Sequence, residues 1–137
     1  MGVFAVIGAR TEGWDERNYH YYAGYCCLTG RSFVNIAASQ IQSYFNPVVY
    51  VPFYWMASRC APQITVFTFG CLHGLNIVAL LRCLNNFLNS GRLATALKAA
   101  CVLVAVIAPA FLVQFGSSGG DVITSVLVLF GLSLIWT

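Results

Sequence analysis

The chain has 137 residues, of which 59% are hydrophobic and only 8% are charged, a balance far from that of soluble domains. This composition excludes an ordinary water-soluble fold, which could not bury so much apolar surface. The formal charge is only +3 and the seven lysines and arginines are scattered, so nucleic acid is excluded as a partner. We expect one domain that lies in a membrane, with lipids and other membrane subunits as its partners.

Residues 1–31 form the polar, aromatic part of the chain. They hold four of the seven tyrosines, together with acidic and basic side chains in mixture. Clustered tyrosines are typical of membrane interfaces, where the ring meets acyl chains and the hydroxyl meets water. We expect an interfacial segment at 1–31, with His20 exposed on its surface, followed by a transmembrane domain at 32–137.

Four apolar stretches predict an all-α, polytopic integral membrane bundle of about four transmembrane helices. We expect these helices at residues 33–57, 62–89, 93–115 and 121–136. The first stretch carries a polar stripe at helical spacing and contains Pro47 and Pro52, so it either lies in the interface or spans with a kink. We favour spanning, because the stretch contains no charged residue.

The positions of the basic residues favour four spans. With four spans, one side of the membrane carries nearly all of them, as the positive-inside rule requires: Arg10, Arg17, Arg31, Arg82, Arg92 and Lys98. The other side then carries Arg59 and Asp121. Without the first span, the two basic clusters would face opposite sides.

The candidate site lies on the second helix, where His73 stands near the middle of an apolar sequence. An ionisable side chain within the membrane is a functional candidate, because it is costly unless it has a partner. Gly70 and Gly74 flank it at a spacing that lets another helix, or a flat cofactor, come close. Asn76 lies one turn further along the same face, and Arg82 lies about two and a half turns beyond the histidine.

These residues fit two kinds of site. In one, His73 is an axial ligand of haem iron, the glycines admit the porphyrin, and Arg82 lies near the propionates. In the other, which spacing alone favours, His73 only forms a hydrogen bond across a helix interface. A proton relay and a contact with substrate are further alternatives.

A family resemblance rests on residues 67–93. The run Phe67-x-x-x-Cys-Leu-His73-x-x-Asn76, then Leu-Leu-Arg82 and a polar break that ends in Gly-Arg-Leu, resembles the larger membrane anchor of succinate dehydrogenase. In that family the first histidine of an H-x-x-N-G-x-R-H motif ligates haem b. This chain departs from the motif at three positions, which hold Ile77, Ala79 and Leu80.

The resemblance implies a b-type haem shared with a partner subunit. His73 would be its iron ligand, surrounded by Gly70, Gly74, Asn76 and Arg82. It also implies a ubiquinone pocket, for which Arg31 and Ser32 are the nearest candidates. The implied location is the mitochondrial inner membrane, within a respiratory complex of the succinate:quinone oxidoreductase type.

The predicted function is therefore that of a small multi-span subunit that anchors and assembles a larger complex. It is not expected to be catalytic alone, because the sequence offers no nucleophile–base pair and no metal cluster. With a haem it would also take part in electron transfer. Two alternatives stay open: a purely structural accessory subunit without a cofactor, and a component of a small transporter or channel.

Overall fold

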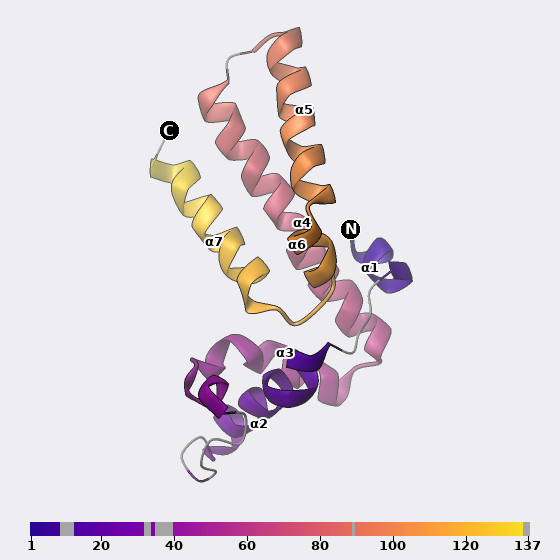
Figure 1. Ribbon diagram of the computed structural model, residues 1–137, viewed down its shortest axis with the longest axis vertical. Coiled ribbons are helices and arrows are strands. Elements are labelled where there is room, and N and C mark those ends of the chain that lie inside the picture. The colour runs from indigo at the N-terminus through magenta and orange to yellow at the C-terminus, as the bar shows by residue number, and fades with distance from the viewer. Residues whose placement is uncertain (9–12, 32–33, 35–39, 89, 136–137) are drawn as a thin grey trace.

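The computed structural model describes residues 1–8, 13–31, 34, 40–88 and 90–135. All regular structure within these ranges is helical, which confirms the all-α class. An upright bundle contains four helices (Figure 1): α4 (Pro62–Phe87), α5 (Arg92–Ile107), α6 (Pro109–Gln114) and α7 (Gly120–Ile135). Below the bundle lies a layer of short helices: η1 (Glu16–His20), α2 (Tyr21–Thr29), η2 (Gln40–Tyr44), η3 (Pro47–Tyr50) and α3 (Val51–Arg59).

Helix α4 is the centre of the bundle. It begins after an extended Ala61, and Pro62 stands in its first turn, where a missing N–H breaks no hydrogen bond. Its buried residues recur every three or four positions: Thr65, Val66, Phe69, Gly70, His73, Asn76, Ala79 and Cys83. In the part of the chain that the structure describes, α4 is the one helix long and apolar enough to cross a membrane.

Helix α7 packs along this buried face and runs parallel to α4. Ser125 Oγ donates a hydrogen bond to Asn76 Oδ1 at 2.8 Å. Further along, Asn86 Nδ2 donates to the carbonyl oxygen of Ser133 at 2.9 Å. Because these pairs lie at well-separated levels of the two helices, they set the register between α4 and α7.

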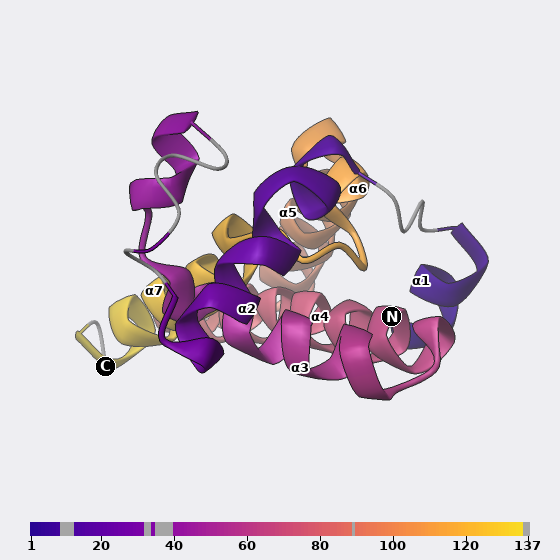
Figure 2. The same ribbon diagram turned by 90° about the horizontal axis from the view of Figure 1, so that it is seen from below.

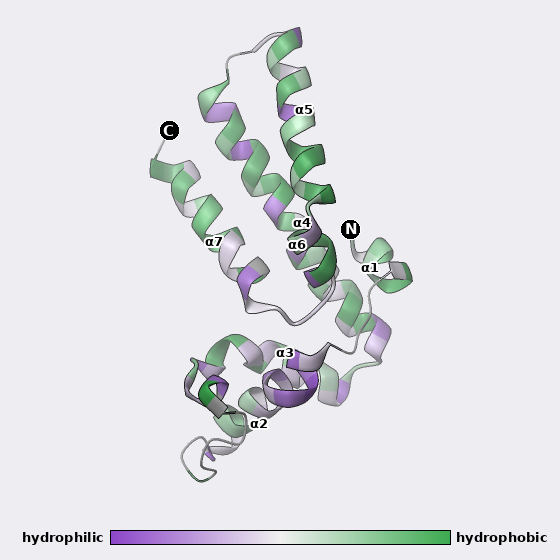
Figure 3. Cartoon of the chain, in the orientation of Figure 1, coloured by the Kyte–Doolittle hydropathy of each residue, from purple (hydrophilic) through white to green (hydrophobic). Residues whose placement is uncertain are grey.

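The chain returns between α4 and α7 through α5 and α6. Pro109 has no N–H and drives the preceding Ala108 out of the helical region, to a ψ of 131°, so the helix expected at 93–115 is divided in two. Helix α5 contacts α4 but buries none of its own residues. Most of its residues are apolar, and its basic residues, Arg92 and Lys98, lie in its first half (Figure 3).

A short N-terminal helix, α1 (Gly2–Gly8), packs against the first half of α4. The contact depends on glycine, because a Cβ at Gly70 would overlap the Cβ of Ala5 and lie 3.2 Å from the Gly2 Cα. One turn later, a Cβ at Gly74 would lie 3.0 Å from the Met1 Cβ. The small-residue face predicted on this helix therefore receives another helix.

Helices α2 and α3 of the layer pack against each other, and α3 also contacts α4 (Figure 2). Gly24 permits their close approach, since a Cβ there would lie 2.7 Å from the carbonyl oxygen of Tyr50. The ring of Tyr54 packs edge-on against Tyr21 and Tyr25, with centroids 4.8 Å and 5.9 Å away. Aromatic contacts thus hold the layer together.

The single helix expected at 33–57 does not form. Its described part contains η2, η3 and α3, while residues 33 and 35–39 lie outside the described ranges. Pro47 and Pro52 stand at the starts of η3 and α3 instead of bending one long helix, and the Asn46 side chain caps η3 by accepting from the Val48 N–H at 3.1 Å. With nine residues, α3 rises only about 13 Å, less than half of a membrane span.

The four-span bundle is accordingly not confirmed. Without the first span, three basic residues lie in or beside the layer, at the start of α4: Arg17, Arg31 and Arg59. Three others lie toward the opposite end of the bundle: Arg82, Arg92 and Lys98. The two basic clusters are therefore at opposite ends, and the positive-inside rule no longer assigns an orientation.

Candidate functional site

The fold brings polar side chains together where the layer meets the bundle. Residues 115–119, which connect α6 to α7, enter this region and bind to both parts. We call the region the junction and define it by Glu16, His20, His73 and Ser118.

Glu16 holds the connection between α6 and α7 to the layer. Its side chain is 8% exposed, and its Oε2 accepts a hydrogen bond from the Gly13 N–H at 2.5 Å. Its Oε1 accepts from the backbone N–H of Ser118 at 3.2 Å and from the Ser118 hydroxyl at 3.3 Å. The carboxylate therefore joins the start of the layer to Ser118 in the connection.

His20 follows Glu16 by one helical turn. It is only 5% exposed, so the prediction that it lies on the surface is wrong. Its Nδ1 is 2.5 Å from the Ser118 Oγ. Its ring stacks on that of Tyr50, with centroids 4.3 Å apart and planes inclined by 16°, and Tyr19 packs edge-on at 4.4 Å. The imidazole is thus enclosed by two aromatic rings and a serine.

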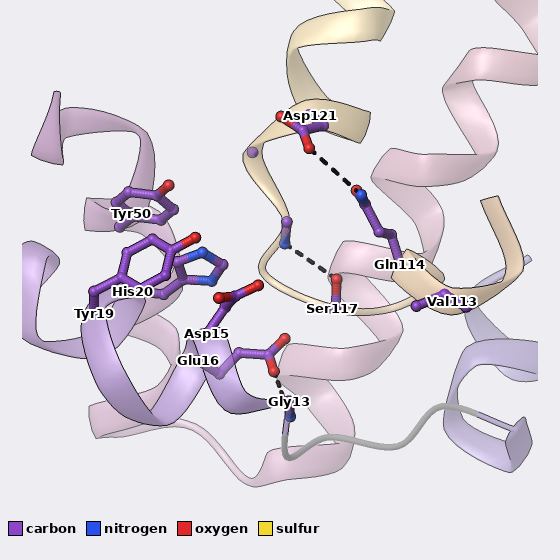
Figure 4. Close-up of a pocket in the computed structure, with 12 residues that line it drawn as sticks. Gly13, Asp15, Glu16, Tyr19, His20, Tyr50, Val113, Gln114, Ser117 and Asp121 are labelled. Carbon is purple, nitrogen blue, oxygen red and sulfur yellow. Dashed lines mark hydrogen bonds between the residues drawn. The ribbon is translucent and has the colours of Figure 1, made fainter. Parts of the chain in front are cut away.

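The rings of Tyr19, His20 and Tyr50 lie together (Figure 4), and burial shifts the pKa of each. Burial lowers the pKa of His20 below its usual value, although the carboxylates of Glu16 and Asp15 act in the opposite direction. Burial, helped by the Asp15 carboxylate, raises the pKa of Tyr19 to about 12. Burial also raises the pKa of Tyr50. All three rings are therefore uncharged at neutral pH.

A pocket of about 180 Å³ opens beside the rings (Figure 4). Three carboxylates contribute to its lining, from Asp15, Glu16 and Asp121. Gln114 closes one side, where its Nε2 donates to the Asp121 Oδ2 at 3.5 Å. The pocket is consequently acidic and aromatic.

His73 holds the same connection to α4. Its side chain is wholly buried, and its Nδ1 accepts a hydrogen bond from the Gly116 N–H at 3.0 Å. A neutral imidazole that accepts at Nδ1 carries its proton on Nε2. Among the described residues, this Nε2 has no hydrogen-bond partner. His73 and Glu16 therefore hold residues 115–119 from two sides.

These surroundings do not fit a haem. A histidine that binds iron needs a free lone pair on one ring nitrogen, while its other N–H donates to a carbonyl or carboxylate. In His73 the Nδ1 lone pair is taken by Gly116, and Nε2 carries the proton. Gly70 and Gly74 are covered by α1 and leave no open face for a porphyrin. Within the described ranges, no three His, Cys, Asp or Glu side chains are grouped to hold a metal ion.

The remaining predicted haem residues have other neighbours. Asn76 is bound to Ser125 of α7. Arg82 is exposed and lies nine positions after His73, which corresponds to about 13 Å along the helix axis. The structure therefore does not bring Arg82 and His73 together.

Of the two predicted quinone residues, the structure describes only Arg31. Arg31 is exposed, and its Nη1 donates to the Tyr25 hydroxyl at 3.4 Å. Ser32 lies outside the described residues. The contact of Arg31 with Tyr25 does not involve the junction.

Sequence reasoning missed Glu16 and Ser118. Glu16 and His20 are four residues apart, a spacing that places two side chains on one helical face, so a signal was present. Ser118 stands in the segment GSSGG, whose composition predicts a turn but not a hydroxyl that is 2% exposed. Its partners lie 98 and 102 positions away, beyond the reach of any local pattern.

Ser118 and His20 form a nucleophile–base contact, but their arrangement differs from that of a hydrolase. In a catalytic triad, the carboxylate binds the ring nitrogen that faces away from the serine. Here the Glu16 carboxylate binds the serine itself. The three side chains therefore connect the layer to the bundle, and the serine is already bound on both sides.

Comparison of the chain with protein-family models, with curated proteins and with solved structures finds no match in any of the three. Its function is consequently inferred from the residues and contacts described above.

Proposed function

We propose that the chain is a small integral membrane protein that acts as a non-catalytic anchoring and assembly subunit of a larger membrane complex. Helix α4 crosses the membrane, and the pair α5–α6 and helix α7 follow it as two further membrane segments. The layer lies at the interface on the side where α4 begins. This arrangement has three membrane segments where the sequence predicted four.

The apolar outer surface of the bundle supports this proposal most strongly. Large apolar side chains that are more than half exposed occur on every helix of the bundle: Ile64, Val78, Leu103, Val104, Ile107, Leu112, Val113, Leu127, Val128 and Leu134. So much exposed apolar surface needs lipid chains or other membrane helices as neighbours. Helix α7, with 16 residues, rises about 24 Å and so covers most of a hydrocarbon core of about 30 Å.

The composition of the layer fits a position at the membrane surface. It holds all seven tyrosines of the chain, a residue type whose ring suits acyl chains and whose hydroxyl suits water: Tyr19, Tyr21, Tyr22, Tyr25, Tyr44, Tyr50 and Tyr54. At the end of α3, the Arg59 guanidinium lies over the Trp55 ring, 5.4 Å from its centroid. This pairing also suits a helix that lies between headgroups and water.

The proposal keeps the anchoring role expected from the sequence. It leaves out a haem, because the contacts of His73 do not suit an iron ligand, and it does not include quinone chemistry. The transport alternative is weaker as well. Two amides of α4 join it to α7, since the buried Asn76 binds Ser125 and the more exposed Asn86 binds the carbonyl oxygen of Ser133. Groups paired in this way hold helices together instead of lining a polar path.

Cysteine labelling tests the arrangement. In a background without other cysteines, Cys60, Thr29→Cys and Ser90→Cys are labelled one at a time with a maleimide that does not cross membranes. We expect positions 29 and 60 to react from one side and position 90 from the other. Four spans would place positions 29 and 60 on opposite sides. Labelling of positions 60 and 90 from the same side would refute a crossing by α4.

The assembly role has its own test. Membranes solubilised in a mild detergent are separated on a native gel, and the chain should migrate in a complex well above the size of the single chain. Migration at the size of the single chain under these conditions would refute the role as a subunit.

A further inference from the structure

Glu16 also borders a second cavity, of about 230 Å³, between the layer and the start of α4. One part of its wall is apolar: Phe53, Ala57, Pro62 and Val66. The other part is polar and consists of Glu16, Thr65 and residues 116–118. A cavity of this kind suits a ligand with a polar head and an apolar body.

Thr65 presents an unused hydroxyl to this cavity. It is only 6% exposed, and its Oγ1 has no hydrogen-bond partner among the described residues. Buried hydroxyls are normally paired, as the neighbouring Thr68 shows by donating to the Ile64 carbonyl oxygen at 2.8 Å. Thr65 therefore has a free oxygen acceptor where a ligand could bind.

Glu16 adds a carboxylate with an unused acceptor position. A carboxylate has about four acceptor positions, and only three are used by Gly13 and Ser118. A cationic donor is a favourable partner for a buried carboxylate. The adjacent imidazole of His20 is uncharged, since burial lowers its pKa. The cavity thus combines a free carboxylate position with a free hydroxyl.

We propose that this cavity binds a primary ammonium group. The ammonium donates hydrogen bonds to the Glu16 carboxylate and to the Thr65 Oγ1, while the attached carbon atoms pack against Phe53 and Val66. An ammonium has three donors and no acceptor, which complements two acceptors and a negative charge. A quaternary ammonium lacks N–H donors and cannot make these bonds.

The ammonium can come from a phospholipid head or from a free amine. The lipid source rests on the proposed function, which places the start of α4 at headgroup level. Recognition of the ammonium itself does not depend on the number of membrane spans. A failure of the binding test is therefore distinguishable from a failure of the labelling test.

Native mass spectrometry of the full chain in detergent tests the proposal. The probes are phosphatidylethanolamine and phosphatidylcholine with identical acyl chains. We expect selective binding of the ethanolamine lipid, weakened about fivefold by Thr65→Val, since one hydrogen bond is lost. Glu16→Gln should weaken binding at least about tenfold, because the lost bond is charge-assisted.

Thr68→Val is the matched control, because the same substitution one turn later removes a hydroxyl that is bound to its own helix. It should bind the ethanolamine lipid as the unmodified chain does. Since the Thr65 hydroxyl has no partner, Thr65→Val should melt at or above the unmodified chain in phosphatidylcholine alone, which separates lost binding from lost folding.

Equal binding of the two lipids, or equal binding by Thr65→Val and Thr68→Val, would overturn the proposal. Competition by free ethanolamine identifies the source. Displacement of the lipid supports recognition of the ammonium alone, and retained lipid with selectivity intact supports recognition of the phospholipid head.

Discussion

The contact between α1 and α4 allows a sharp prediction from Gly70→Ala. The added Cβ would overlap the Ala5 Cβ and lie 3.2 Å from the Gly2 Cα. Both neighbours are rigid, since one is a backbone atom and the other is attached directly to the backbone. The overlap can be relieved only if α1 moves as a whole.

Two effects oppose each other in this variant. Replacing glycine by alanine inside a helix stabilises it by about 1 kcal/mol. Overpacking a close contact costs about 1–3 kcal/mol. Because α1 has only seven residues, the chain limits this cost by detaching α1. We expect the free energy of unfolding to fall by about 0–2 kcal/mol and α1 to lose its protection.

The matched control is Gly131→Ala on α7, where an added Cβ meets nothing within 4 Å. This variant should gain about 1 kcal/mol from helix propensity alone. Hydrogen exchange of residues 2–8 and thermal unfolding in detergent measure both variants. Combining Gly70→Ala with Ala5→Gly should restore the protection of α1. If Gly70→Ala keeps this protection and is stabilised as much as Gly131→Ala, the close contact is refuted.

Three further predictions concern the junction. Burial lowers the pKa of His20 in the folded protein, so the unfolded chain binds more protons below a pH of about 6.5. The free energy of unfolding should therefore fall on acidification, by up to about 1.4 kcal/mol per pH unit. Thermal unfolding between about pH 7.5 and 5 should show this fall, and His20→Gln should remove it. Ser118→Ala removes the hydroxyl between His20 and Glu16, so chemical denaturation should show a loss of about 1–3 kcal/mol, and an unchanged midpoint would contradict the connection. His73→Gln keeps an acceptor near the Gly116 N–H and should fold with an unchanged reduced-minus-oxidised visible spectrum, whereas a lost b-type band would contradict our interpretation of this site.

The sequence by itself determined the class of the protein and its central helix. The apolar composition, Pro62 at the first turn, and buried residues at intervals of three or four are local properties, so α4 is found where its pattern predicts it. The pair Gly70 and Gly74 also predicted a close approach to the backbone. Its occupant, α1, comes from a distant part of the chain and leaves no signal beside the glycines.

The role of each proline was decided by tertiary structure. A proline either bends a helix or begins one, depending on whether neighbouring groups can satisfy the backbone carbonyls that it leaves free. Pro47 and Pro52 begin short helices of the layer, so the first predicted span is lost. The short helices η3 and α3 pack against α2, and the residue pattern at 33–57 does not predict these contacts.

The sequence indicates His73 and the shared face of Glu16 and His20, but the contacts that form the junction are decided by tertiary structure. Its hydrogen bonds join residues 43, 98 and 102 positions apart: His73 to Gly116, His20 to Ser118 and Glu16 to Ser118. Helical periodicity predicts which side chains share one face, but it does not predict which distant loop meets that face. Only the packing of the layer below the bundle places these groups within hydrogen-bond distance of one another.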